Sequence, residues 1–172
     1  AIPDAVLMFL KDKKDLGIHT EMFSDGVVAL VEAGVINNTK KKTHIGKFVA
    51  TFFMGTKKLY DFVAGNADVE MYPVDYVNHP VVVIKEDNIV SVNSCVQIDL
   101  MGQAASESIG YTQISGVGGQ VDFIRGAAMA KNGRSILAFP STAARGTVSK
   151  IVPLLDEGAA VTTSRNDVDY VV

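Results

Sequence analysis

Hydrophobic residues in the first half of the chain fall into short runs that alternate between helical and strand spacing. Residues 3–15 place apolar side chains at helical spacing opposite lysines and aspartates, which predicts a helix that Gly17 ends. The pattern then predicts strands over 16–20, 48–54 and 69–74, helices over 27–34 and 59–63, a turn at 24–26 and a loop over 36–47. Gly34 and Gly65 follow the two helices, as C-terminal glycines commonly do.

The second half adds a predicted hairpin and one longer helix. Residues 81–84, a turn at 86–88, and the alternating run 89–100 predict a long β-hairpin. Residues 102–114 are irregular, 121–130 predict a helix, and 136–139, 147–152 and 160–163 predict strands. The fold class is therefore α/β, with an open, mixed, mainly parallel sheet flanked by helices and a β-hairpin insertion.

Composition narrows the class of protein. The chain has 172 residues, 48% of them hydrophobic, which is enough for one domain with a substantial core. A net charge of −3 argues against nucleic acid as a partner, and Lys40, Lys41 and Lys42 are interpreted as a solvated loop. One cysteine excludes an intrachain disulfide and fits a reducing, cytoplasmic compartment, with Cys95 as a small core side chain. No apolar run approaches the ~20 residues of a membrane span.

Glu21 is the first candidate for chemistry. It follows a predicted apolar strand, and side chains at the carboxyl ends of strands face the ligand crevice of open α/β sheets. It could act there as a nucleophile or acid–base group, or simply face solvent or cap the next turn. Asp25 is interpreted as a turn or cap residue. His19 alternates with Glu21 and fits a hydrogen-bonded core histidine; with His44 and His79 isolated, we predict no metal site.

Two further segments could supply hydrogen-bond donors. Asn78 precedes His79 and Pro80, and is either a turn residue or an amide donor that points into the crevice. Residues 116–119, Gly-Val-Gly-Gly, come directly before a predicted helix, where backbone N–H groups can hold an anion or oxyanion; close packing is the alternative. The sequence has neither a P-loop nor a dinucleotide-binding fingerprint nor a nucleophile elbow.

Four segments in order, residues 17–26, 78–80, 116–123 and 140–144, resemble the acetyl-CoA hydrolase/transferase family. The resemblance runs over the whole chain and covers the carboxyl-terminal catalytic half of such an enzyme. It implies that residues 1–172 form this catalytic domain, cut at both ends, with a missing amino-terminal domain of similar topology. It also implies a homo-oligomeric, metal-free enzyme with coenzyme A as substrate, and no membrane partner.

The resemblance also assigns roles. It implies that the enzyme moves CoA between acetyl-CoA and a small carboxylic acid such as 4-hydroxybutyrate, through an acyl-glutamyl anhydride and an enzyme–CoA thioester. Glu21 matches the catalytic glutamate; Asn78, and Gly118 or Gly119, match the donors that steady the oxyanion on the thioester side. Two alternatives are an acyl-CoA hydrolase that uses the same glutamate and a non-catalytic CoA-binding domain. The presence of Glu21 speaks against the second, since binding alone does not require it.

Overall fold

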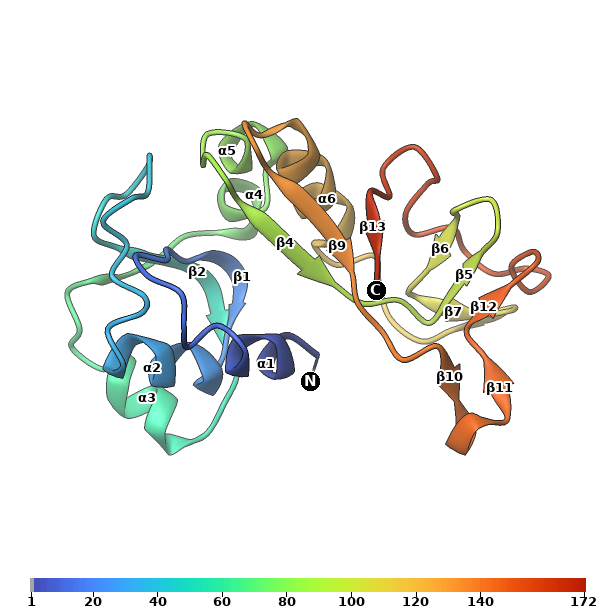
Figure 1. Cartoon of the computed structure of the whole chain (residues 1–172), viewed down its shortest axis with the longest axis horizontal. Coiled ribbons are helices and arrows are strands. Elements are labelled where there is room, and N and C mark those ends of the chain that lie inside the picture. Colours follow the sequence, from blue (N-terminus) through green and yellow to red (C-terminus); the bar gives the residue numbers. More distant parts are fainter. Residues whose placement is uncertain (1) are drawn as a thin grey trace. The chain divides into compact units, whose positions relative to one another are not determined.

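Helices and short, mostly parallel strands alternate along the chain in the computed structural model, which describes residues 2–172 (Figure 1). The helices are α1 (Ile2–Met8), α2 (Asp25–Glu32), α3 (Lys57–Val63), α4 (Val74–Val77), α5 (Pro80–Val83) and α6 (Gln120–Met129), with a 3₁₀ turn at Ala144–Gly146. The strands are β1 (His19–Phe23), β2 (Phe48–Phe53), β3 (Val69–Met71), β4 (Val90–Asn93), β5 (Gln97–Asp99), β6 (Ala104–Ala105), β7 (Ser108–Ile109), β8 (Thr112–Gln113), β9 (Arg134–Leu137), β10 (Thr142–Ala143), β11 (Val148–Ser149), β12 (Ile151–Val152) and β13 (Tyr170–Val171). The chain divides into two compact units between Asp87 and Asn88.

The first unit is built on the parallel sheet β1-β2-β3. Helices α2 and α3 cover one face of this sheet, and α4 packs against β1 and β2 from the other (Figure 1). Phe23 lies at the centre of the core, where its ring contacts those of Phe48, Phe53 and Phe62. Burying one such side chain contributes roughly 1.5–3 kcal/mol relative to leaving it exposed, so the core holds β1 firmly in place.

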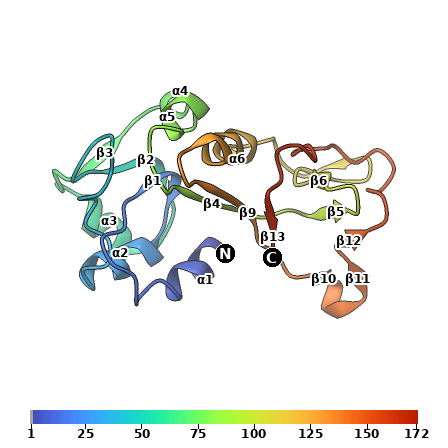
Figure 2. The same ribbon diagram turned by 45° about the horizontal axis from the view of Figure 1, so that its top comes forward.

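The second unit contains a second parallel sheet, in the order β13-β9-β4, and α6 packs against β4 and β9 (Figure 2). A smaller mixed sheet, β12-β5-β6, and two antiparallel hairpins, β7-β8 and β10-β11, complete it. Ile124 on α6 and Leu137 on β9 are almost fully buried. Helix α6, including its amino-terminal end, is thereby packed firmly against the sheet.

The α/β class with mainly parallel sheets is confirmed, and so are several elements. Strand β2 and helices α2, α3 and α6 lie within a few residues of their predicted ranges. Gly34 follows α2 with φ +73°, the left-handed conformation that lets the chain leave a helix at little cost. Cys95 is buried, as predicted.

The predicted hairpin over 81–100 is wrong. Residues 81–83 belong to helix α5, because Pro80 occupies its first turn and the His79 ring nitrogen Nδ1 accepts a hydrogen bond from the Val81 N–H. Residues 89–100 split into β4 and β5, which join different sheets. Antiparallel hairpins do occur, but in β5-β6, β7-β8 and β10-β11.

Other boundaries also differ from the prediction. Helix α1 ends at Met8, β3 ends at Met71, and residues 160–163 contribute an isolated bridge between Thr163 and Ala104. The strands form separate sheets where one was predicted. Across the described residues, every helix is too short or too polar to cross a membrane.

Candidate functional site

Glu21 lies in the middle of strand β1, two residues before its end, whereas the sequence predicted it directly after a strand. The predicted strand over 16–20 is displaced because Leu16 pairs with Ile36, whereas His19–Phe23 pair with β2. Glu21 is partly buried and lies two residues after His19 on β1, so the two side chains share one face of the sheet. This is the face that α4 covers. The carboxylate is thus held on a packed strand.

Asn78 holds the Glu21 carboxylate directly. Its amide Nδ2 donates a 2.6 Å hydrogen bond to Glu21 Oε2, and its side chain is 97% buried, with 3% exposed. Asn78 lies between α4 and α5, as the residue that ends α4. A donor bonded to a carboxylate in a buried setting forms one of the stronger hydrogen bonds in proteins. Asn78 is therefore both the residue that ends α4 and an amide donor to Glu21, and its place in a ligand crevice stays a prediction.

His19 makes a second connection between β1 and α4. Its Nε2 lies 2.7 Å from the carbonyl oxygen of Val77, the residue before Asn78. Because a carbonyl only accepts, Nε2 carries the proton. Burial lowers the pKa of the His19 imidazole more than this hydrogen bond raises it. A neutral His19 therefore fixes the backbone that presents Asn78 to Glu21.

Two polar atoms close to Glu21 have unused hydrogen-bonding capacity. Thr51 lies across from Glu21 in β2, between the registered pairs Thr20–Ala50 and Met22–Phe52. Its hydroxyl and the Asn78 amide oxygen are both buried and have no hydrogen-bond partner within the described part of the chain. Buried polar groups are normally paired, so such exceptions mark a place where function can outweigh stability.

The glycine-rich loop lies in the second unit, before α6. Gly118 has φ +62°, and Gly119 is the buried residue that caps the helix. The backbone N–H of Ser115 donates to the Glu107 carbonyl before the loop. After it, the buried Gln120 amide donates to the hydroxyls of Ser106 and Thr163, each at 2.9 Å. The loop is fixed at both ends, and the first turn of α6 leaves backbone N–H groups without intrahelical partners. That a backbone N–H group of this loop acts together with Glu21 stays a prediction.

The remaining candidates have structural partners. The Asp25 carboxylate accepts from the Thr56 N–H at 2.8 Å and from its hydroxyl at 2.9 Å, which ties α2 to the start of α3. Burial raises the pKa of the Cys95 thiol to about 11, so it is no thiolate nucleophile. Among residues 5–172, whose side chains the structure describes, no cluster of three or more histidine, cysteine or acidic side chains could hold a metal ion.

Three features of this unit are not signalled by the sequence. Thr51 comes next to Glu21 only through strand register. Contrary to the prediction, His44 is not isolated, because its ring bonds Glu70 and Tyr76, which are 26 and 32 positions away in the sequence. Lys41 is buried, whereas all three lysines at 40–42 were predicted to be solvated. No local pattern signals such long-range contacts.

Comparison with known proteins places the chain in a family. The family model described as acetyl-CoA hydrolase/transferase C-terminal domain matches residues 55–172. The chain is 72% identical over all of its 172 residues to a 4-hydroxybutyrate coenzyme A transferase of Clostridium kluyveri. It is 54% identical over 171 residues to a succinyl-CoA:cyclohexane-1-carboxylate CoA transferase of Geobacter metallireducens. It spans 40% and 39% of the lengths of these two relatives.

Solved structures share the fold. RipA from Yersinia pestis is 47% identical, with a TM-score of 0.94 over 100% of this chain and 39% of that one. A 4-hydroxybutyrate CoA-transferase from Porphyromonas gingivalis is 53% identical, with a TM-score of 0.85 over 99% of this chain and 39% of that one. At these identities, the elements that carry Glu21 and Asn78 correspond to elements of experimental structures.

Proposed function

Because the chain belongs to the acetyl-CoA hydrolase/transferase family, we propose that it is the carboxyl-terminal catalytic part of a CoA-transferase with Glu21 as its nucleophile. The observation that carries the proposal is the bond from the buried Asn78 amide to one oxygen of the Glu21 carboxylate. A structural carboxylate is usually exposed or paired with a cation. This one is partly buried on a strand and is held by a neutral amide, which leaves its charge in place for attack.

The proposed reaction begins at Glu21. Its carboxylate attacks the thioester carbonyl, the carbon–sulfur bond breaks, and CoA leaves as the thiolate. The resulting acyl-glutamyl anhydride is attacked at the glutamyl carbonyl by that thiolate, which releases the first acid and leaves CoA as a thioester on Glu21. An acceptor carboxylate then reverses these steps. Each tetrahedral intermediate carries an oxyanion that hydrogen-bond donors must stabilise, at about 2.7–4 kcal/mol per donor.

The position of Asn78 favours a particular step. Its Nδ2 is bonded to Glu21 Oε2, so the other carboxylate oxygen is the one available for attack. Once that oxygen forms the anhydride, Oε2 becomes the glutamyl carbonyl oxygen. When the thiolate attacks the glutamyl carbon, the negative charge develops on Oε2, where the amide already donates. We propose that Asn78 stabilises this oxyanion, and that Gly118 or Gly119 supplies a backbone N–H donor.

The finer identity of the enzyme is part of the proposal. Two matched relatives are named for 4-hydroxybutyrate and the family for acetyl-CoA, and we propose acetyl-CoA and a small acid such as 4-hydroxybutyrate as substrates. We propose a cytoplasmic homo-oligomer that needs no metal; the single cysteine is consistent with a reducing compartment. The family also includes hydrolases, and CoA release that does not depend on an acceptor acid would identify one.

Mass spectrometry of the full-length protein tests the nucleophile. After exposure to acetyl-CoA, we expect CoA attached covalently at Glu21 and no adduct in Glu21→Gln, which should also lose transfer activity. Glu21→Asp should lose activity by about 10²-fold, because the shorter side chain withdraws the oxygen by ~1 Å. Glu32→Gln is the matched control, since Glu32 is an exposed partner of Lys58. An active Glu21→Gln variant would contradict the proposal.

A further inference from the structure

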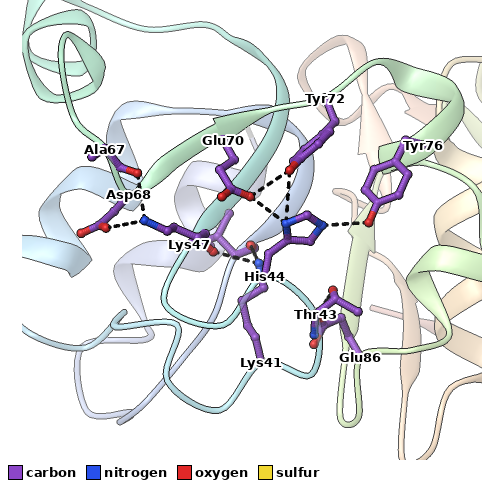
Figure 3. Close-up of polar contacts among 11 residues, drawn as sticks. Lys41, Thr43, His44, Lys47, Ala67, Asp68, Glu70, Tyr72, Tyr76 and Glu86 are labelled. Atoms are coloured by element: carbon purple, nitrogen blue, oxygen red, sulfur yellow. Dashed lines mark hydrogen bonds and ion pairs between the residues drawn. The ribbon is translucent and has the colours of Figure 1, made fainter.

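Four hydrogen-bonded side chains, termed here the His44 cluster, join three segments of the first unit (Figure 3). His44 lies in the loop before β2, Glu70 on β3, Tyr72 just after β3, and Tyr76 on α4. The His44 Nδ1 is 2.7 Å from Glu70 Oε2, and its Nε2 is 2.8 Å from the Tyr76 hydroxyl. The Tyr72 hydroxyl donates to the same Glu70 oxygen at 3.2 Å. One imidazole thus connects the sheet to α4.

The loop that carries His44 has two further anchors. The carboxylate of Glu86, which is 94% buried with 6% exposed, accepts from the backbone N–H groups of Lys42 and Thr43 at 2.8 and 3.0 Å, and also from the Thr43 hydroxyl. The buried Lys41 ammonium donates to the carbonyls of Ile18 and Lys47, each at 2.8 Å. The loop therefore contacts the residue before β1 and the segment after α5.

These contacts matter because α4 and α5 are too short to be stable on their own. Each has four residues, and helices this short are not stable without tertiary contacts. Asn78 lies between them, two residues after Tyr76. Its position against Glu21 must then depend on what holds α4. The fully buried Val77 packs α4 against β1 and β2, and two hydrogen bonds add to this packing, His19 at Val77 and His44 at Tyr76.

The backbone of His44 has an unfavourable conformation that its side-chain contacts hold in place. Its φ is +46°, in the left-handed region that costs a non-glycine residue roughly 1–2 kcal/mol. Such a conformation persists only where the surroundings determine it, and it concentrates at functional sites. Here the two ring nitrogens are held by Glu70 and Tyr76, so the strained residue is also the one that makes the connection to α4.

We propose that His44 and Tyr76 are positioning residues, which hold α4 so that the Asn78 amide meets the Glu21 carboxylate. The inference rests on the proposed function for its effect on catalysis. Its structural part, that the His44–Tyr76 bond orders α4, stands independently of the reaction.

Removing a single hydroxyl tests this role. Tyr76→Phe in the full-length protein keeps the ring but deletes the bond to His44. Because a misplacement of ~1 Å can cost 10²-fold, we expect kcat to fall about tenfold with the KM for acyl-CoA unchanged. Tyr72→Phe is the matched control. It removes a hydroxyl that bonds Glu70 at 3.2 Å and lies 3.4 Å from His44 Nδ1, but it is outside α4 and leaves the His44–Tyr76 bond in place, so kcat should stay near wild type. His44→Asn, which tolerates the left-handed backbone but is too short to reach Tyr76, should repeat the Tyr76→Phe result.

A double-mutant cycle separates positioning from general destabilisation. If Tyr76 acts through Asn78, Tyr76→Phe should cause no further loss of kcat in an Asn78→Ala background. An equal loss in both backgrounds, or a wild-type kcat in Tyr76→Phe, would overturn the proposal.

Hydrogen–deuterium exchange gives a readout that is independent of catalysis. The backbone amides of 76–78 should exchange faster in Tyr76→Phe than in Tyr72→Phe; equal exchange would overturn the ordering of α4. If Glu21→Gln stayed active, the proposed function would fail, whereas the exchange result would still decide whether His44 orders α4.

Discussion

At the scale of single residues, the site depends on uncharged groups that surround one charge. The Glu21 carboxylate is met by the Asn78 amide, and the backbone beside that amide is held by an imidazole whose pKa burial lowers. A charged His19 would add a competing electrostatic partner on the same face of β1. The sequence motifs predict Glu21 and Asn78 as site residues. The bond between them cannot be read from the sequence, because 57 positions separate the two residues.

The lowered pKa of His19 predicts a loss of stability in acid. The unfolded chain takes up a proton as the pH falls through the ordinary value of 6.5, whereas the folded chain does so only at lower pH. The unfolded state therefore binds more protons in this window, and the free energy of unfolding decreases as the pH falls. His19→Gln keeps an N–H that can donate to Val77 but does not titrate. When the pH is lowered, we expect the thermal midpoint of His19→Gln to fall less than that of the wild type.

The measurement is a pair of thermal unfolding curves for the full-length protein at about pH 7.5 and about pH 5.0. His79→Gln is the control, since His79 is exposed and a glutamine Oε1 can still accept from the Val81 N–H that His79 Nδ1 bonds. Equal acid sensitivity in the wild type and His19→Gln would show that His19 does not take part.

At the scale of elements, the sequence predicted what local pattern determines and failed where tertiary context decides. Helix α6 and strand β2 follow from periodicity and from the glycines that bound them. Residues 81–83 are three valines with strong strand propensity, yet they form α5 because His79 and Pro80 start a helix. The division of 89–100 between two sheets depends on pairing with β9 and β12, which lie far along the chain.

The loop before α6 carries the prediction at this scale. Gly118 has φ +62°, so an alanine there is strained by roughly 1–2 kcal/mol even though a Cβ would meet no described atom within 4 Å. We expect Gly118→Ala to reorient the backbone N–H groups of the loop and to lower kcat. Gly116→Ala is the matched control, because the space around Gly116 is equally open and its φ is not positive.

Steady-state transfer kinetics of the two full-length variants make the comparison. A loss of kcat confined to Gly118→Ala supports a catalytic role for the loop conformation. Equal rates in both variants would show that the reaction does not depend on it.

At the scale of the whole molecule, the chain provides two compact units and spans about 40% of the length of the curated relatives it matches. Both units expose large apolar side chains: Phe9 is 81% exposed in the first, and Leu100 and Tyr111 are 75% and 79% exposed in the second. Exposed apolar side chains of this size are available for contacts with further protein.

The last prediction is that the 172-residue chain alone does not catalyse CoA transfer. A transferase must exclude water from its anhydride and thioester intermediates, since water would hydrolyse either one. The chain spans about 40% of the length of the curated relatives it matches, and we expect the rest of the enzyme to supply this enclosure. The isolated chain, checked for folding by circular dichroism, should show no transfer from acetyl-CoA to short carboxylic acids. Adding the separately expressed remainder of the enzyme should restore it. Turnover by the isolated chain at the rate of the full-length enzyme would mean that these residues form and enclose the whole site.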